Sequence, residues 1–139
     1  TSIGSFAFAD CPNLVSLFIP DTVTFIGEYA FSNNPTLVLY MEHVSVPLTW
    51  SVDWNNLGPT EVYWAVNHRY IYVEPDNGDA QIHIYQKIGT AVTAPADPVK
   101  AGYVFSGWYV YNGSFYEPFV FDFMPENDVL VVALWEPEI

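Results

Sequence analysis

The amino-acid sequence predicts a mainly β protein in two parts, the end of an α/β repeat solenoid followed by a small second β domain. First, the motif Ile-Gly-x-x-Ala-Phe occurs at residues 3–8 and again at residues 26–31, an offset of 23 residues. A period in the twenties is typical of solenoids built from short strands and return segments. Second, no third copy follows residue 40. Third, residues 70–74 and 80–85 alternate as two strands around a turn.

Each repeat is expected to contribute one short strand to the solenoid. In the first copy Leu14, Leu17 and Ile19 have the spacing of a strand whose inward side chains stack on those of the next coil. Pro20 ends the strand, and residues 21–22, Asp-Thr, predict a turn. Because one coil alone cannot bury both of its faces, the core forms only when coils stack.

The return segment of the second copy has a helix-like pattern. Ile26, Ala30 and Phe31 are spaced by four and five residues, which favours a short helical segment on this side of the coil. Gly27 is expected to permit a tight bend where the segment begins. This pattern is the source of the α part of the predicted α/β solenoid.

Residues 41–66 are expected to close the end of the solenoid. The repeat motif is absent there, and three tryptophans, Trp50, Trp54 and Trp64, occur instead. Without a cap, the last coil of a solenoid would expose its apolar end to water. Burying one large aromatic side chain stabilises a fold by about 2–3 kcal/mol, so the tryptophans suit such a cap. The first domain is therefore placed at residues 1–66.

The repeat region, from residue 3 to about residue 40, resembles the BspA-type leucine-rich repeats of bacterial surface proteins. The shared pattern is Ile-Gly-x-x-Ala-Phe-x-x-Cys/Asn-x-x-Leu, and Cys11 and Asn34 occupy the position where that family alternates between these two residue types. A small buried polar group there can bond to the neighbouring backbone. The resemblance therefore implies a structural role for Cys11 rather than a nucleophilic one.

The second domain is placed at residues 68–139 and is expected to begin with a β-hairpin. Residues 75–79, Pro-Asp-Asn-Gly-Asp, separate the two alternating segments, and an Asn-Gly pair is a strong hairpin-turn signal. Pro95 and Pro98 make residues 94–100 unsuitable for a helix or a central strand. An extended connection is expected there.

Residues 70–137 resemble the Listeria–Bacteroides repeat, also called the internalin B-repeat. The matching motifs are Gly-Tyr-x-Phe-x-Gly-Trp-Tyr at residues 102–109 and a closing strand that ends in Ala-x-Trp at residues 133–135. The resemblance implies a small ubiquitin-like, β-grasp-like module, with a curved sheet and a short helix or irregular crossover. Modules of this family are found on bacterial cell-surface proteins.

The first motif also predicts a local irregularity. If Phe105 and Trp108 both enter the core, their odd spacing breaks the two-residue alternation of a strand. A bulge or kink is therefore expected near Gly107.

The closing strand has a second apolar face. Val129, Val131, Ala133 and Trp135 form one face of the strand. The other face is an apolar stripe of Leu130, Val132 and Leu134, where the family more often has polar residues. We expect the stripe to be covered by the solenoid cap, by the crossover or by another molecule.

The composition excludes some partners. The formal net charge is −13, and Arg69, Lys87 and Lys100 are the fixed cations, so a phosphate backbone would be repelled and nucleic acid is not an expected partner. No apolar run approaches the roughly 20 residues that span a bilayer, so no membrane insertion is expected. Because Thr1 lies inside a repeat, most of the binding surface is expected upstream of it.

No group of residues suggests catalysis, a metal or a cofactor. The three histidines, His43, His68 and His83, lack metal-ligand spacing, and His83 is expected at the surface of an alternating strand. Carboxylate pairs such as Asp53 with Glu61 match no motif that would place them across a cleft. We therefore expect no enzyme activity and no cofactor.

Exposed aromatic side chains are the remaining candidates for binding. Tyr109, Tyr111, Phe115 and Tyr116 flank the loop at residues 112–114, where they either stack on sugar rings or contribute to the core. Together with the apolar stripe they form the candidate binding surface.

The sequence therefore predicts a secreted or surface-attached bacterial protein that is not an enzyme. Its expected function is adhesion or recognition of a host or extracellular protein by the solenoid. Two alternatives are carbohydrate binding by the second domain and a purely architectural stalk.

Overall fold

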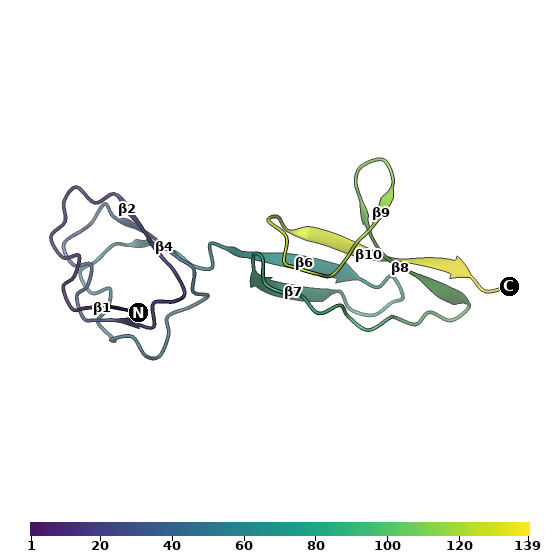
Figure 1. Ribbon diagram of the computed structural model, residues 1–139, viewed down its shortest axis with the longest axis horizontal. Coiled ribbons are helices and arrows are strands. Elements are labelled where there is room, and N and C mark those ends of the chain that lie inside the picture. The colour runs from purple at the N-terminus through teal and green to yellow at the C-terminus, as the bar shows by residue number, and fades with distance from the viewer. The chain divides into compact units, whose positions relative to one another are not determined.

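The computed structural model describes all 139 residues, which form ten strands and no helix (Figure 1). The chain divides into two units, Thr1–Asn67 and His68–Ile139. Each unit has its own cluster of buried hydrophobic side chains. The predicted mainly β class is confirmed.

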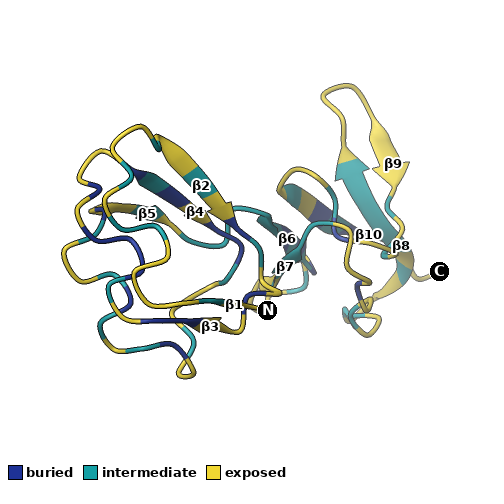
Figure 2. Ribbon diagram, turned by 60° about the vertical axis from the view of Figure 1, so that its left-hand side comes forward, coloured by how far each residue is buried: buried dark blue, intermediate teal, exposed yellow.

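The first unit is built of stacked coils whose strands pair in parallel. Its strands are β1 (Ser2–Ile3), β2 (Ser16–Ile19), β3 (Phe25–Ile26), β4 (Val38–Met41) and β5 (Glu61–Tyr63). β1 pairs with β3, and a second sheet has the order β2-β4-β5. Figures 1 and 2 show the two sheets on opposite sides of the coils.

The strands of the larger sheet alternate as the sequence predicts. Ile19, Leu39 and Met41 are at most 2% exposed and face inward, whereas Phe18 and Tyr40, which alternate with them, are exposed. A turn follows β2, where the Val23 amide donates to the Pro20 carbonyl at 3.1 Å. The predicted strand and turn are therefore confirmed.

In the segment just before its strand, the second repeat has one residue fewer than the first. Leu14 and Leu37 are 23 residues apart, but Leu17 pairs with Leu39 at an offset of 22. The same shift places Phe18 opposite Tyr40 in the sheet.

The return segment contains turns where the sequence suggested a helix, so the helical part of the α/β expectation is not met. Phe6 and Asp10, and their counterparts Tyr29 and Asn33, have φ between 52° and 59°, in the left-handed region that interrupts a helix. Their amides bond to the next coil instead. The Phe6 amide donates to the Glu28 carbonyl at 3.1 Å, and that of Tyr29 donates to the Asp53 carbonyl at 2.9 Å.

Residues 50–66 complete a third coil although the repeat motif is missing there. The Ser51 amide donates to the Ile26 carbonyl, as the Gly27 amide does to that of Ile3, so Trp50 takes the place of the repeat isoleucine. β5 then pairs with β4. Trp50 and Trp54 are 5% and 8% exposed, and the half-buried Trp64 packs against the same core. The tryptophans therefore close the core below the second coil.

Gly27 is required for close packing between coils rather than for a bend. Its φ is not positive, but a Cβ at this position would lie 2.5 Å from the Ser5 amide nitrogen and 2.9 Å from the Gly4 carbonyl carbon. Backbone atoms cannot yield as the end of a side chain can. The first coil therefore rests directly on this glycine.

We expect Gly27→Ala to lower the free energy of unfolding of the first unit by about 1–3 kcal/mol, the usual cost of overpacking. The measurement is backbone amide hydrogen exchange in β3 and β4. Gly4→Ala is the matched control, because Gly4 has the same place in the first repeat and a Cβ there meets nothing within 4 Å. Equal effects of the two substitutions would contradict the packing explanation.

The second unit is a five-stranded sheet. Its strands are β6 (His68–Glu74), β7 (Ile82–Lys87), β8 (Tyr103–Tyr111), β9 (Tyr116–Pro118) and β10 (Val129–Pro137). Their order is β7-β6-β10-β8-β9, in which β6 and β10 are parallel and the other neighbours antiparallel. The predicted hairpin is β6–β7. Residues 94–100 have no regular secondary structure, as expected of an extended connection.

The predicted bulge is present in β8. Leu134 pairs with Gly107 and Trp135 with Phe105, so the register shifts by one residue at Ser106. The φ of Gly107 is 127°, which suits glycine. Phe105 and Trp108 consequently lie on one face with ring centroids 5.1 Å apart. The crossover before β10 is irregular, without the short helix that was one of its two expected forms.

One face of this sheet is covered and the other is not. Ile71, Val73 and Val131 are fully buried on the covered face, beneath Val92 and Met124 from the connecting segments. By the register of the strands, the opposite face holds the side chains that alternate with these. That face is described with the site below.

Candidate functional site

A row of exposed aromatic side chains crosses the β2-β4-β5 sheet. Phe18, Tyr40 and Tyr63 are register partners on the three strands, and 49%, 41% and 52% of their surfaces are exposed. The rings of Tyr40 and Tyr63 stack with centroids 5.6 Å apart. We call these three residues the aromatic row. Because parallel strands fix their spacing, the row is a rigid, solvent-facing surface on three successive coils.

Sequence reasoning missed the aromatic row. Phe18 and Tyr40 each lie between two inward residues of a repeat strand, so the alternation alone marks them as outward-facing. Their alignment depends on the shortened second repeat, and that of Tyr63 depends on a third strand without a repeat motif. With the register known, an alignment of residues 16–19, 38–41 and 61–64 places the three aromatic residues at one position.

The polar position shared by the repeats is structural, as the sequence indicates. Asn34 is 3% exposed, and its Oδ1 accepts from the Cys11 amide at 2.9 Å. Its Nδ2 donates to the carbonyls of Phe8, Phe31 and Ser32 at 2.6, 3.0 and 3.2 Å. Cys11 is half-buried, with Sγ 3.5 Å from the Ala9 carbonyl oxygen. These bonds join adjacent coils and leave no reactive arrangement.

The structure places six of the seven predicted surface residues on the uncovered face of the second sheet. The six are Leu130, Val132, Leu134, Tyr109, Tyr111 and Tyr116. Leu130 remains 51% exposed, whereas Val132 and Leu134 are half-buried. Val132 pairs with Tyr109, and the Tyr109 ring covers Gly107, the partner of Leu134. Tyr109 therefore shields part of the apolar stripe.

Tyrosines of the first hairpin extend this face, and sequence reasoning did not identify them. Tyr70 stacks on Tyr72 and on Tyr85, with centroids 5.1 and 4.5 Å apart. Burial raises the pKa of Tyr85, with smaller contributions in the same direction from Tyr70 and Asp128, while Arg69 lowers it. Tyr70 therefore stacks with both neighbours, while 41% of the Tyr85 surface remains exposed.

The β8–β9 hairpin holds the most exposed aromatic side chains of the predicted set. Tyr111, Phe115 and Tyr116 are 56%, 58% and 48% exposed, and the hairpin projects from the sheet (Figure 1). Asn112 Oδ1 accepts from the amides of Ser114 and Phe115 at 2.9 and 3.0 Å, which fixes the tip. Phe115 therefore lies at the tip rather than on the sheet face.

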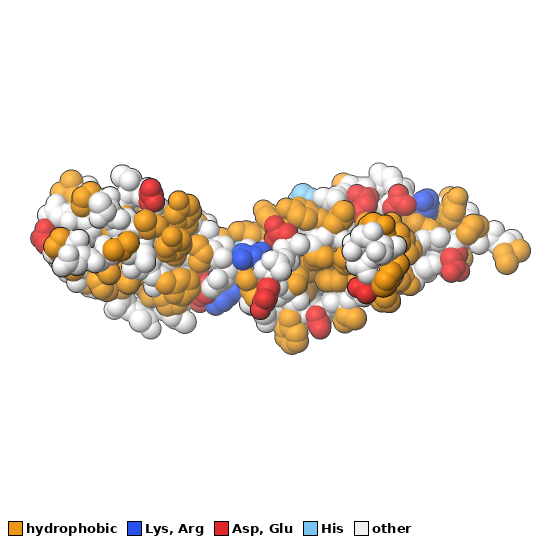
Figure 3. Space-filling view, turned by 90° about the horizontal axis from the view of Figure 1, so that it is seen from above, with side chains coloured by type: hydrophobic (Ala, Val, Ile, Leu, Met, Phe, Trp, Pro, Cys, Tyr) orange, Lys and Arg blue, Asp and Glu red, His pale blue; other side chains and the backbone are white.

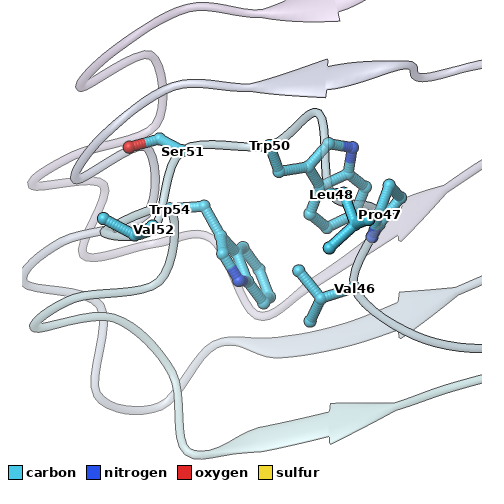
Figure 4. Close-up of a pocket in the computed structure, with 7 residues that line it drawn as sticks. All are labelled: Val46, Pro47, Leu48, Trp50, Ser51, Val52 and Trp54. Atoms are coloured by element: carbon cyan, nitrogen blue, oxygen red, sulfur yellow. The ribbon is translucent and has the colours of Figure 1, made fainter.

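A hollow of about 440 Å³ opens on the last coil of the first unit. Figure 4 shows the indoles of Trp50 and Trp54 in its wall, with Val46, Pro47 and Leu48 on one side and Ser51 and Val52 on the other. Leu48 and Val52 are almost fully exposed at its rim. The hollow is apolar and has no charged side chain in its lining.

The titratable residues do not form a reactive centre. No three His, Cys, Asp or Glu side chains lie together as a metal site. His43 Nε2 lies 2.9 Å from the Val23 carbonyl oxygen, and its ring packs against Trp50 at 4.9 Å. His83 is exposed on β7, as expected, and contacts Gln81.

Comparison with protein families gives two matches. Residues 1–42 match the model of the BspA type leucine rich repeat region, and residues 71–133 match that of the Listeria-Bacteroides repeat domain. Both resemblances predicted from the sequence are confirmed. Such repeats are typical of bacterial surface or secreted proteins, and leucine-rich repeats generally mediate protein interactions. The structure contains strands and no helix, and therefore has no candidate for a membrane-spanning helix.

Proposed function

We propose, from the two families that the chain matches, that it is a non-catalytic part of a bacterial surface or secreted protein that recognises an extracellular protein. Residues 1–66 would be the end of a leucine-rich solenoid with its tryptophan cap. Residues 68–139 would be a β-grasp-like module of the internalin B-repeat kind. Fold alone assigns function loosely, so the proposal depends on a specific surface.

The aromatic row is the observation that supports protein recognition. Protein interfaces are enriched in aromatic anchors, and a few such residues dominate the affinity. Phe18, Tyr40 and Tyr63 present half of their surfaces to solvent although their strands are rigid and paired. Rigid anchors lose little conformational entropy on binding, which favours affinity. The row is therefore the proposed contact surface for a host or other extracellular protein.

The test is binding of the purified chain to a panel of extracellular host proteins, measured by biolayer interferometry. A triple variant, Phe18→Ser with Tyr40→Ser and Tyr63→Ser, is expected to weaken any specific complex at least tenfold. Val15→Ser is the matched control, because Val15 is 72% exposed and lies outside the row. Undiminished binding by the triple variant, or no binding partner in the panel, would count against this function.

Carbohydrate binding by the second unit is a second candidate, supported by the exposed aromatic residues of the β8–β9 hairpin. Sugars stack on accessible ring faces, and Tyr70 already stacks with Tyr72 and Tyr85. Tyr111 and Tyr116 are tilted by 46° to each other and are about half exposed. A glycan array probed with the chain and with the Tyr111→Ala/Tyr116→Ala pair tests this. Equal signals, or none from the unaltered chain, reject it.

A further inference from the structure

The aromatic row lies on a unit that has no positively charged side chain. Residues 1–67 contain no Lys or Arg, and all three such residues of the chain lie at or after position 69. The same segment has six carboxylates: Asp10, Asp21, Glu28, Glu42, Asp53 and Glu61. Figure 3 shows acidic side chains scattered among hydrophobic ones on the visible surface of this unit. An anionic partner would therefore be repelled.

One of these carboxylates, Glu61, lies beside the row on the outer face of the sheet, whereas Glu42 is only 6% exposed. Glu61 is exposed on β5, two residues before Tyr63, so both side chains point to the outer face. Glu42 follows β4, two residues after Tyr40. Its Oε1 accepts from the Asp21 amide at 3.1 Å, and its Oε2 accepts from Asn67 Nδ2 at 2.7 Å. Glu61 is therefore the carboxylate that places negative charge beside the exposed rings, and the Glu42 carboxylate is bonded inside the unit.

The rings themselves favour cations. The face of an aromatic ring has negative potential, and an Arg or Lys side chain within about 6 Å of the ring centroid is attracted to it. The Tyr40–Tyr63 stack uses one face of each ring and leaves the opposite faces directed along the row. Phe18, next in register to Tyr40, does not join the stack. Ring faces and the Glu61 carboxylate therefore combine on one surface.

From this charge complementarity we propose that the aromatic row binds an Arg- or Lys-rich segment of the partner protein, with cationic side chains over the rings and beside Glu61. The inference rests on the proposed recognition function and names its partner class. An apolar segment would leave the Glu61 carboxylate desolvated without a counter-charge, which is costly. A cationic segment can form cation–π contacts with the rings and can also pair with the Glu61 carboxylate.

The probes are three synthetic peptides of equal length in which serine alternates with arginine, leucine or glutamate. Titration against the full chain, followed by NMR shifts of the Tyr40 and Tyr63 rings, is expected to show binding of the arginine peptide only. The binding should weaken as salt is raised, because the contacts are exposed. Preferred binding of the leucine peptide would overturn the cationic partner while leaving protein recognition intact.

Three variants separate a cation–π contact from apolar contact and from net charge. Tyr40→Phe keeps the ring and should leave the affinity nearly unchanged, whereas Tyr40→Leu keeps apolar area and should weaken binding roughly twofold to fivefold. Glu61→Gln should weaken it roughly twofold. Glu28→Gln is the matched control, because Glu28 is an exposed carboxylate two residues after β3, outside the β2-β4-β5 sheet that carries the row. Equal losses for Glu28→Gln and Glu61→Gln would show only a general charge effect and overturn the site.

Failure of the inference and failure of the proposed function give different results. If none of the peptides binds while a host protein binds and the triple variant abolishes that complex, the row is a recognition surface and its partner is not a basic segment. If host proteins bind equally to the triple variant, the function assigned to the row is wrong whatever the peptides do.

Discussion

Trp54→Ala is expected to lower the free energy of unfolding of the first unit by about 3–5 kcal/mol, the usual cost of removing a large buried aromatic side chain. Trp54 is 8% exposed and packs edge-to-face against Phe31, Trp50 and Trp64, with centroids 6.2, 5.2 and 6.0 Å apart. The loss is a large share of the stability of a unit of this size.

The measurement is backbone amide hydrogen exchange in β2, β4 and β5, because exchange reports the first unit separately from the second. All three strands are expected to lose protection together. Val52→Ala is the matched control from the same turn, since Val52 is 96% exposed and its truncation should change stability by less than about 0.5 kcal/mol. Unchanged protection after Trp54→Ala would mean that the tryptophans do not close the core.

The repeat predicted the buried positions of the first unit but not the path of the return segment. The period identified Ile26, Phe31 and Leu37 as equivalent inward residues, and all three are at most 1% exposed. The segment forms turns in place of the expected helix because Phe6 and Tyr29 adopt left-handed conformations, and the amides of these two residues bond to the next coil. Phe and Tyr rarely adopt the left-handed conformation. Contacts between coils therefore impose it, and the local sequence pattern could not predict it.

The sequence did not predict the third coil, and the reason differs from that for the turns. Its backbone repeats the hydrogen bonds of the preceding coils. Its inward side chains, however, are tryptophans, and the spacing between these residues differs from that of the repeat motif. Without the motif, the sequence indicated only a cap. Since Tyr63 belongs to this coil, the aromatic row could not be recognised before the register of β4 and β5 was known.

In the second unit, the alternation of inward and outward side chains predicted more of the structure than the repeat did in the first. Phe105 and Trp108 required a bulge at Gly107 if both faced the core, and the register confirms it. The exposure of tyrosines was harder to predict, because a tyrosine on an alternating strand suits either face of a sheet. Tyr70 and Tyr72 were therefore passed over, although they lie on the same face as Leu130.

Asn34→Ala should lower the stability of the first unit by about 3–4 kcal/mol, because it removes one accepted hydrogen bond and the two N–H donors that three carbonyls share. Each bond contributes about 1 kcal/mol, and a buried partner left unpaired costs about 1–3 kcal/mol more. The Phe31 carbonyl belongs to a buried residue and would lose this donor, whereas the Ser32 carbonyl would keep the Asp10 amide. The Cys11 amide and Phe8 carbonyl are only partly buried, so water can replace part of those bonds.

The comparison that isolates this effect is Thr36→Ala, two residues further on, where the side chain is exposed and the change should be close to neutral. Urea unfolding of both variants, followed by amide exchange at β3 and β4, measures the difference. Because Asn34 bonds to Cys11 and Phe8 of the first coil, the variant should also loosen β1 and β2, on the far side of the substituted position. A loss of protection confined to residues 31–37 would contradict this, because it would mean that the asparagine stabilises its own turn and does not join the coils.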